Sequence, residues 1–305
     1  MFKLDFAHKP TQWLILCLLA LTWGSSFILM KKALVFFTPD TVATYRIALA
    51  SLVLFPIAIR NLDKIKGHVW PLLAVGLFGN GLPALLFAEA QTQIPSSLGG
   101  ILNSLTSLFT LLIGVVLFRL KTTVYQVIGV FVALIGAAGL IGFNSLASFS
   151  ENSQHALLAV IAASMYGLAV NTIKTKLPEM RPTHITALSF LMTGPWCLLY
   201  LLIGTDFISI ITEDAKSWSA VGYLTILAVI GTAAAVVLFN RLIKETTAVF
   251  ASSVTYLIPV VAVGWGILDG EYVTLMDGGF MLFILMGIFM INSSRPKALI
   301  NRLFR

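Results

Sequence analysis

The sequence predicts an all-α, polytopic membrane protein with ten transmembrane helices, and two observations lead to this prediction. Hydrophobic residues make up 58% of the 305 residues and charged residues only 11%, which leaves too little polar surface to cover a soluble globule. Apolar runs of roughly 20 residues, the length that crosses about 30 Å of hydrocarbon, recur along the chain. No run alternates as the strands of a membrane barrel do, so we expect helices whose backbone polar groups pair internally.

The predicted helices follow one another through mostly short loops. The first apolar run comes after a short polar segment and is long enough to cross the bilayer. We therefore expect a membrane helix there and not a cleavable signal peptide. The expected helices cover residues 12–32, 40–60, 68–91, 96–118, 123–144, 154–173, 183–205, 217–239, 246–268 and 273–293.

The distribution of lysine and arginine predicts the orientation. If the N-terminus is cytoplasmic, most basic residues lie in cytoplasmic segments, whereas Lys31, Lys32 and Lys216 lie outside. Both termini are then cytoplasmic, and we expect a multi-pass protein of the cell membrane, the inner membrane in a bacterium. The net charge of +7 is explained by this topology, so we expect no nucleic-acid partner. The cytoplasmic set is Lys3, Lys9, Arg60, Lys64, Lys66, Arg119, Lys121, Lys174, Lys176, Arg181, Arg241, Lys244, Arg295, Lys297, Arg302 and Arg305.

An internal repeat relates the two halves of the chain. The pair Trp23-Gly24 precedes Lys31 at the same spacing at which Tyr166-Gly167 precedes Lys174. We predict a first five-helix repeat over 1–146 and a second over 147–305, which ends in a short basic tail. Because five is odd, the repeats must be inverted, an arrangement typical of alternating-access carriers. Further matched pairs are Pro39 with Pro182, Gly79 with Gly231, Asn80 with Thr232, Phe87 with Phe239, Glu89 with Arg241, and Gly136 with Gly287.

Several stretches resemble one transporter family. They are WGSSFILMKK, TYRIALAS with Arg46, LFNRLIKETTAVFASSVTYLIPVVAV, and LDGE at 268–271. Over residues 12–293 the chain resembles the EamA-type branch of the drug/metabolite transporter superfamily. The resemblance implies ten helices in an inverted five-plus-five arrangement and secondary transport of small polar metabolites, amino acids or related compounds, in the outward direction. The sequence departs from the family where 105–108 lacks a mid-helix proline and where 119–121 replaces Gly-Glu.

Charged residues in or near the spans are candidates for gating or coupling. Arg46 lies about 9 Å deep from the outer face, at a depth similar to that of Glu89. We hypothesise that they form an ion pair that belongs to an outward gate; a permanent stabilising pair, or a hydrated Glu89, is the alternative. Lys31 and Lys174 are repeat-related candidates that could attract anionic groups, although both could simply snorkel to the interface. Arg241 is a candidate cytoplasmic gate residue, and positive-inside charge explains it nearly as well.

Polar and aromatic residues within the spans are candidates for lining a substrate cavity. An amide in hydrocarbon must bond to a neighbouring helix or face a polar cavity, and we favour the cavity. The aromatic pair from the repeat is included because of its pseudo-symmetric placement, with packing as the alternative. The candidates are Trp23, Ser26, Asn80, Asn103, Tyr166, Asn171 and Tyr256.

Two prolines are candidate hinges. Pro83 follows Gly79 and Gly81 near the middle of its helix, and Pro259 lies within another. Proline removes a backbone donor and bends a helix, so each is expected to act as a hinge unless its kink is harmless.

Enzymatic chemistry is not indicated. The histidines His8, His68, His155 and His184 form no metal-binding pair, and no nucleophile elbow or Walker loop is present. We expect no cofactor and no metal. The expected partners are a small-molecule substrate and the lipid bilayer, with a proton as the candidate coupling ion if Glu89 carries it. An uncoupled facilitator or gated pore is the alternative, and a membrane enzyme or receptor is less favoured. A monomer suffices, and the oligomeric state stays open.

Overall fold

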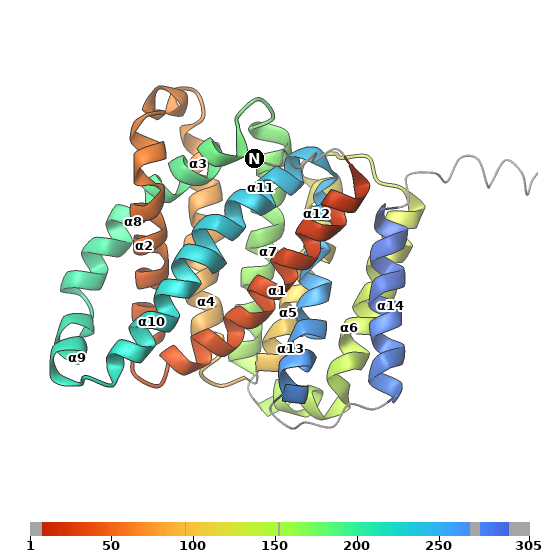
Figure 1. The fold of residues 1–305 in the computed structure, drawn as a ribbon. Helices are drawn as coiled ribbons and strands as arrows, with labels where there is room; N and C mark the ends of the chain where they lie inside the picture. Colours follow the sequence, from red (N-terminus) through yellow and green to blue (C-terminus); the bar gives the residue numbers. More distant parts are fainter. Residues whose placement is uncertain (1–7, 95, 152, 269–274, 293–305) are drawn as a thin grey trace, which may run out of the picture.

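The computed structural model describes residues 8–94, 96–151, 153–268 and 275–292, and within them the secondary structure is helical throughout (Figure 1). Residues 269–271 of the LDGE motif and the basic tail lie outside the described residues. Six helices of the described part are long and apolar enough to cross a membrane, and four apolar helices are shorter. The chain therefore has the fold of a polytopic helical membrane protein.

The first half is built from the helices up to residue 151. The expected helix over 68–91 is present but is made of two α-helical pieces joined by a π-helical segment, η2. In the loop before it, Gly67 has a φ of 80°, a left-handed conformation that suits glycine. The elements are α1 (Lys9–Ala33), α2 (Pro39–Ile59), the 3-10 helix η1 (Leu62–Ile65), α3 (Val69–Gly76), η2 (Leu77–Gly81), α4 (Leu82–Ala90), α5 (Ser96–Val116) and α6 (Val124–Glu151).

The second half repeats this pattern with additions. A π-helical segment, η3, again joins two α-helical pieces. The expected helix over 246–268 is interrupted at Ser253, and a short helix, α9, occupies the loop near 207–213. The elements are α7 (Ser153–Lys176), α8 (Pro182–Ile203), α9 (Phe207–Glu213), α10 (Ser217–Ala228), η3 (Val229–Ala234), α11 (Ala235–Glu245), α12 (Ala248–Ser252), α13 (Val254–Leu268) and α14 (Leu275–Asn292).

Small residues let the helices pack closely, as is common in membrane bundles. A Cβ atom at Gly24 of α1 would lie 2.6 Å from the Cβ of Val261 in α13. A Cβ atom at Gly167 of α7 would lie 2.8 Å from the backbone nitrogen of Thr110 in α5. The repeat-related glycines thus occupy equivalent contacts, α1 with α13 and α7 with α5. At the edge of the bundle, α6 packs along α14 (Figure 1).

Apolar side chains divide between the helix contacts and the outer surface. Leu16, Ile47 and Phe190 are fully buried between helices, whereas Trp70 and Ile203 are each 78% exposed. Large exposed apolar residues are expected where a bundle faces lipid. Figure 1 shows the start of α1 together with α3, α11 and α12 at one edge of the bundle and α9 at the other. We call the first of these the N-terminal edge.

Candidate functional site

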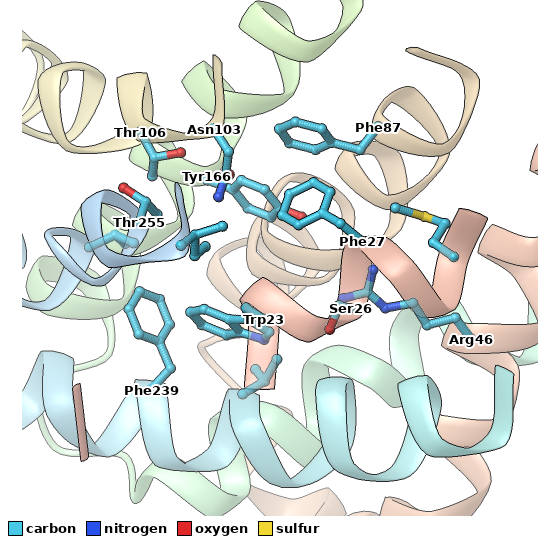
Figure 2. Close-up of a pocket in the computed structure, with 14 residues that line it drawn as sticks. Trp23, Ser26, Phe27, Arg46, Phe87, Asn103, Thr106, Tyr166, Phe239 and Thr255 are labelled. Carbon is cyan, nitrogen blue, oxygen red and sulfur yellow. The ribbon is translucent and has the colours of Figure 1, made fainter. Parts of the chain in front are cut away.

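A cavity lies between helices of both halves. Its empty volume is about 790 Å³, which includes the open space at its mouth. Side chains from α1, α2, α4, α5, α7, α11 and α13 line it (Figure 2). The lining residues are Trp23, Ser26, Phe27, Met30, Arg46, Phe87, Asn103, Thr106, Tyr166, Val170, Val236, Phe239, Thr255 and Ile258.

The π-helical segment η3 positions two of these side chains. The indole Nε1–H of Trp23 donates to the carbonyl oxygen of Gly231 at 2.8 Å. The hydroxyl of Thr232 donates to the carbonyl of Leu227 at 2.9 Å and accepts a hydrogen bond of 2.5 Å from Nε of Arg46. A π-helical turn shifts backbone bonding from the fourth to the fifth preceding residue, and such turns are frequent at functional sites. The segment therefore fixes both the indole and the guanidinium at the cavity wall.

Two aromatic pairs related by the sequence repeat face the cavity. Trp23 packs edge-to-face on Phe239, with ring centroids 5.1 Å apart and an interplanar angle of 73°. Tyr166 stacks on Phe87 at 6.0 Å and 18°. The sequence aligns Trp23 with Tyr166 and Phe87 with Phe239, so the pairs are equivalent. Phe27 lies beside Tyr166 and Phe87 in Figure 2. Aromatic walls of this kind bind apolar or aromatic parts of a ligand.

Asn80 does not line the cavity, contrary to the expectation from the sequence. It is buried within η2, and its Nδ2 donates to the carbonyl of Val75 at 3.3 Å. Its repeat partner Thr232 bonds in the same way to Leu227, which is also five residues earlier. Both side chains therefore bond to a carbonyl at their π-helical turn. Only the side chain of Thr232 also reaches a cavity residue.

Asn171 and Tyr256 also lie away from the cavity. The Nδ2 of Asn171 donates to the carbonyls of Thr110 at 2.9 Å and Gly167 at 2.8 Å, which ties α7 to α5. Asn171 lines a second pocket, of about 350 Å³ empty volume, with residues of the loop after α5. Tyr256 is fully buried and donates to the carbonyl of Val130 at 3.5 Å. Of the sequence-predicted cavity residues, Trp23, Ser26, Asn103 and Tyr166 are on the lining.

The hypothesised Glu89–Arg46 ion pair is not formed. Glu89 is exposed, while Arg46 bonds to Thr232 and lines the cavity. Lys31 is exposed at the end of α1. Arg241 forms a salt bridge of 3.0 Å with Glu245, one helical turn away.

Lys174 instead joins a reciprocal contact at the N-terminal edge. Its Nζ donates to the carbonyls of Ile243 at 2.9 Å, Lys244 at 3.1 Å and Thr246 at 2.5 Å. The Nζ of Lys244 donates to the carbonyls of Leu177, at 2.7 Å, and Pro178. The last carbonyls of a helix lack intrahelical partners and carry partial negative charge, so each lysine stabilises the end of the other's helix.

The prolines contribute to the cavity walls in different ways. Pro259 has no N–H for the carbonyl of Thr255, and the hydroxyl of Ser104 donates to that carbonyl at 3.1 Å. The same hydroxyl lies 3.1 Å from the carbonyl oxygen of Gly100, so it shares its one proton between its own helix, α5, and the carbonyl of α13 that Pro259 leaves without an intrahelical donor. Pro83 is buried in the first turn of α4, directly after η2. Their role as hinges stays a prediction.

Several lining residues escaped sequence reasoning. Phenylalanine, methionine and threonine within apolar helices look like packing residues, because the sequence does not reveal which helix face is turned inward. A signal existed for Phe87 and Phe239, which the repeat matches to each other. The additional lining residues are Phe27, Met30, Phe87, Thr106, Val170, Val236, Phe239, Thr255 and Ile258.

Comparison with known proteins identifies relatives over nearly the whole chain. An uncharacterized transporter of Archaeoglobus fulgidus is 25% identical over 288 residues, covering 93% of this chain and 99% of the relative. The uncharacterized inner membrane transporter YedA of Escherichia coli K12 is 27% identical over 266 residues, covering 83% and 81%. A probable amino-acid metabolite efflux pump of Salmonella typhimurium is 27% identical over 287 residues, covering 89% and 91%.

A crystal structure of another protein shares the fold. It superimposes with a TM-score of 0.71 at 16% identity and covers 98% of this chain and 100% of the other. The model of the EamA-like transporter family matches residues 11–142 and again residues 154–293. These matches extend over most of the chain, and the relatives are named as transporters. The chain is therefore a membrane transporter that belongs to the EamA-like transporter family.

Proposed function

We propose that this transporter is a secondary carrier that moves small polar metabolites, amino acids or related compounds, out of the cell by alternating access. The observation that carries the proposal is the cavity with two equivalent aromatic pairs in its wall, Trp23–Phe239 and Tyr166–Phe87. In each pair, one ring comes from the first half of the chain and the other ring from the second half. The name of the Salmonella relative supports both the solute class and the direction. The name of the Escherichia coli relative supports the inner membrane as the location.

The proposed topology has ten membrane helices in two inverted five-helix repeats, 1–146 and 147–305, with both termini in the cytoplasm. Two successive matches to one family model support the repeat. The matching π-helical segments η2 and η3 support it as well, as do the equivalent contacts of Gly24 and Gly167. Cytoplasmic segments of membrane proteins carry an excess of lysine and arginine, and on this ground we place the N-terminal edge on the cytoplasmic side.

Alternating access requires the contacts between the cavity and the cytoplasmic edge to break. On α7, Val170 lines the cavity, Asn171 lines the second pocket, and Lys174 lies beyond both. In this state Asn171 ties α7 to α5, and the Lys174–Lys244 contact ties α7 to α11. Both pockets lie along the contact between α5 and α7. Breaking the contacts of Asn171, Lys174 and Lys244 would join the two pockets into a path to the cytoplasm.

Flux measurements in proteoliposomes test the proposal. We expect saturable uptake of at least one solute from a panel of amino acids, purines and sugars. We also expect counterflow, in which unlabelled solute inside accelerates labelled uptake. A gated pore would give neither saturation nor counterflow, and this outcome would replace the carrier by the alternative. Imposing a pH gradient separates proton-coupled transport from uncoupled transport.

A plugging variant connects the flux to the cavity. Val236→Trp adds a large ring to the cavity wall, and we expect it to abolish uptake. Ile226→Trp is the matched control, because Ile226 lies in the same membrane span and is 46% exposed on the outer surface. Equal uptake by both variants would mean that the solute does not pass through this cavity.

A further inference from the structure

We infer that the cavity contains an anion subsite at the guanidinium of Arg46 and selects solutes that join one carboxylate to an apolar or aromatic body. The inference rests on the proposed function and names its solute class. It is argued from the position of Arg46, from the charges around it, and from the chemistry of the other walls.

Arg46 is held with its binding groups toward the cavity. Thr232 donates its own proton to Leu227 and so presents an oxygen lone pair, which accepts the Nε–H of Arg46 at 2.5 Å. This bond uses one of the five guanidinium donors. Figure 2 shows the end of the guanidinium beside Ser26 and Phe27, inside the ring of lining residues. A guanidinium fixed in this way is suited to a carboxylate, whose two oxygens match its planar donors.

No counter-ion neutralises Arg46 in the part of the chain that the structure describes. None of the cavity-lining residues found there is acidic, and the salt bridges formed there join other residues. Asp40, on the same helix, accepts a hydrogen bond of 3.1 Å from Tyr200, and Glu89 is exposed. A charge at this depth is costly unless it is paired or hydrated, and its field is weakly screened. The cavity therefore favours an anion and disfavours a cation.

The remaining walls define the rest of the solute. The aromatic pairs and Phe27 offer apolar faces to the cavity. In Figure 2, Tyr166 and Phe27 lie between Arg46 and a neutral polar group made by Asn103, Thr106 and Thr255. These neutral groups can bond a hydroxyl, amide or ammonium group but cannot neutralise a charge. The hydroxyl of Thr106 is buried and, among the described residues, has no hydrogen-bond partner.

One guanidinium neutralises one negative charge. A phosphate monoester carries about −1.5 to −2 at neutral pH, so it would leave excess charge in this cavity. A carboxylate leaves none. An amino acid brings one carboxylate for Arg46, and its ammonium group is hydrogen-bonded but not neutralised by the neutral polar groups. An amine without a carboxylate brings a second positive charge and no anion for Arg46.

A series of three compounds with one aromatic body tests the subsite. The probes are 3-phenylpropanoate, an anion, L-phenylalanine, a zwitterion, and phenethylamine, a cation. Binding to purified protein is measured directly with each labelled compound at neutral pH and constant ionic strength. We expect 3-phenylpropanoate and L-phenylalanine to bind and phenethylamine to bind at least tenfold more weakly, about 1.4 kcal/mol.

Variants assign the selectivity to Arg46. Losing one partner of a desolvated charge pair weakens binding by about 30-fold or more, and we expect this for 3-phenylpropanoate with Arg46→Gln. Arg46→Lys should retain part of the affinity because it keeps the charge. Arg60→Gln is the matched control, since Arg60 is exposed at the other end of α2. Binding of phenethylamine should not weaken in Arg46→Gln.

The outcomes separate this inference from the proposed function. Equal binding of phenethylamine and 3-phenylpropanoate by the wild type would overturn the subsite, and so would undiminished carboxylate binding by Arg46→Gln. Failure of 3-phenylpropanoate to bind the wild type would overturn it too, even if other solutes cross the membrane. Absence of flux for every solute in the proteoliposome panel would instead contradict the proposed function. If Arg46→Gln does not fold, the wild-type series and Arg46→Lys decide the question.

Discussion

Lys174 and Lys244 each bind the end of the helix that carries the other. Lys174 of α7 donates to three carbonyls where α11 ends, and Lys244 of α11 donates to two carbonyls just after α7. The two cations lie at the same edge of the bundle without an acidic partner shared between them in the described residues. Backbone carbonyls, which cannot be titrated or removed by a side-chain change, hold them in place.

This reciprocal contact predicts that Lys174→Gln lowers stability. The variant leaves three carbonyls with a shorter, neutral donor, and hydrogen bonds to a charged group contribute about 1.5–3 kcal/mol when buried. Because Lys174 is half-buried, we expect a loss of about 1–2 kcal/mol, measured as a lower midpoint of thermal unfolding in detergent. Lys176→Gln is the control, since Lys176 is exposed on the same helix. Equal midpoints for the two variants would contradict the contact.

The role of η3 predicts that Thr232→Val impairs transport while preserving the fold. Valine keeps the shape of threonine but cannot accept the Nε–H of Arg46, so the guanidinium loses its fixed orientation. We expect the solute concentration at half-maximal uptake to rise about 5- to 10-fold. Thr172→Val is the matched control, because the Thr172 hydroxyl bonds only within its own helix, to Leu168. A similar rise in the control would mean that lost hydroxyls act through stability and not through Arg46.

Close helix contacts predict strong effects of alanine at Gly167. The added Cβ would lie 2.8 Å from the backbone nitrogen of Thr110 and 2.9 Å from the backbone carbonyl carbon of Phe109. Backbone cannot move aside as a side chain can, so we expect overpacking to cost about 1–3 kcal/mol and to lower the yield of folded protein. Gly222→Ala is the control, because nothing lies within 4 Å of its added Cβ. Thermal unfolding and size-exclusion profiles compare the two, and an unchanged Gly167→Ala would contradict the contact.

The exposure of Glu89 predicts a small effect of Glu89→Gln. Its carboxylate does not line the cavity and does not pair with Arg46, so we expect uptake at each pH to match that of the wild type within a factor of about two. The measurement is initial uptake over a range of pH. Loss of the pH dependence of uptake in the variant would show that Glu89 carries the coupling proton, as first hypothesised from the sequence. It would also imply a second state in which Glu89 is less exposed.

The repeat allowed part of the site to be predicted from sequence. Trp23 and Tyr166 stand at matching places in the two halves, and both line the cavity. Ser26 and Asn103 also line it, because they are polar residues on helices that face inward. Hydrophobicity alone could not identify these cavity-lining residues, since nearly every position in these helices is apolar.

Two features could not be predicted because they depend on long-range geometry. A pair between Arg46 and Glu89 was hypothesised because the two residues were expected at a similar depth in the membrane. In the structure Arg46 instead donates to Thr232 in the other half of the chain. Asn80 was expected to face the cavity, yet it bonds within its own helix. The π-helical turn that directs Asn80 has no sequence signature beyond nearby glycines, and helix rotation cannot be read from uniformly apolar runs.

The π-helical segments show that the number of residues in each helix, and not only their identity, determines which side chains face the cavity. Each contains one residue more than an α-helix of the same rise requires. The wider turn of η2 absorbs that residue, so the phase of α4 relative to α3 is kept. Deleting one residue from α4 ahead of Phe87 would instead turn the rest of α4 by about 100°. Phe87 would then leave its place opposite Tyr166, although every remaining side chain would be unchanged. The angular phase between the two pieces of each helix, and not only their composition, thus determines which surface the solute meets.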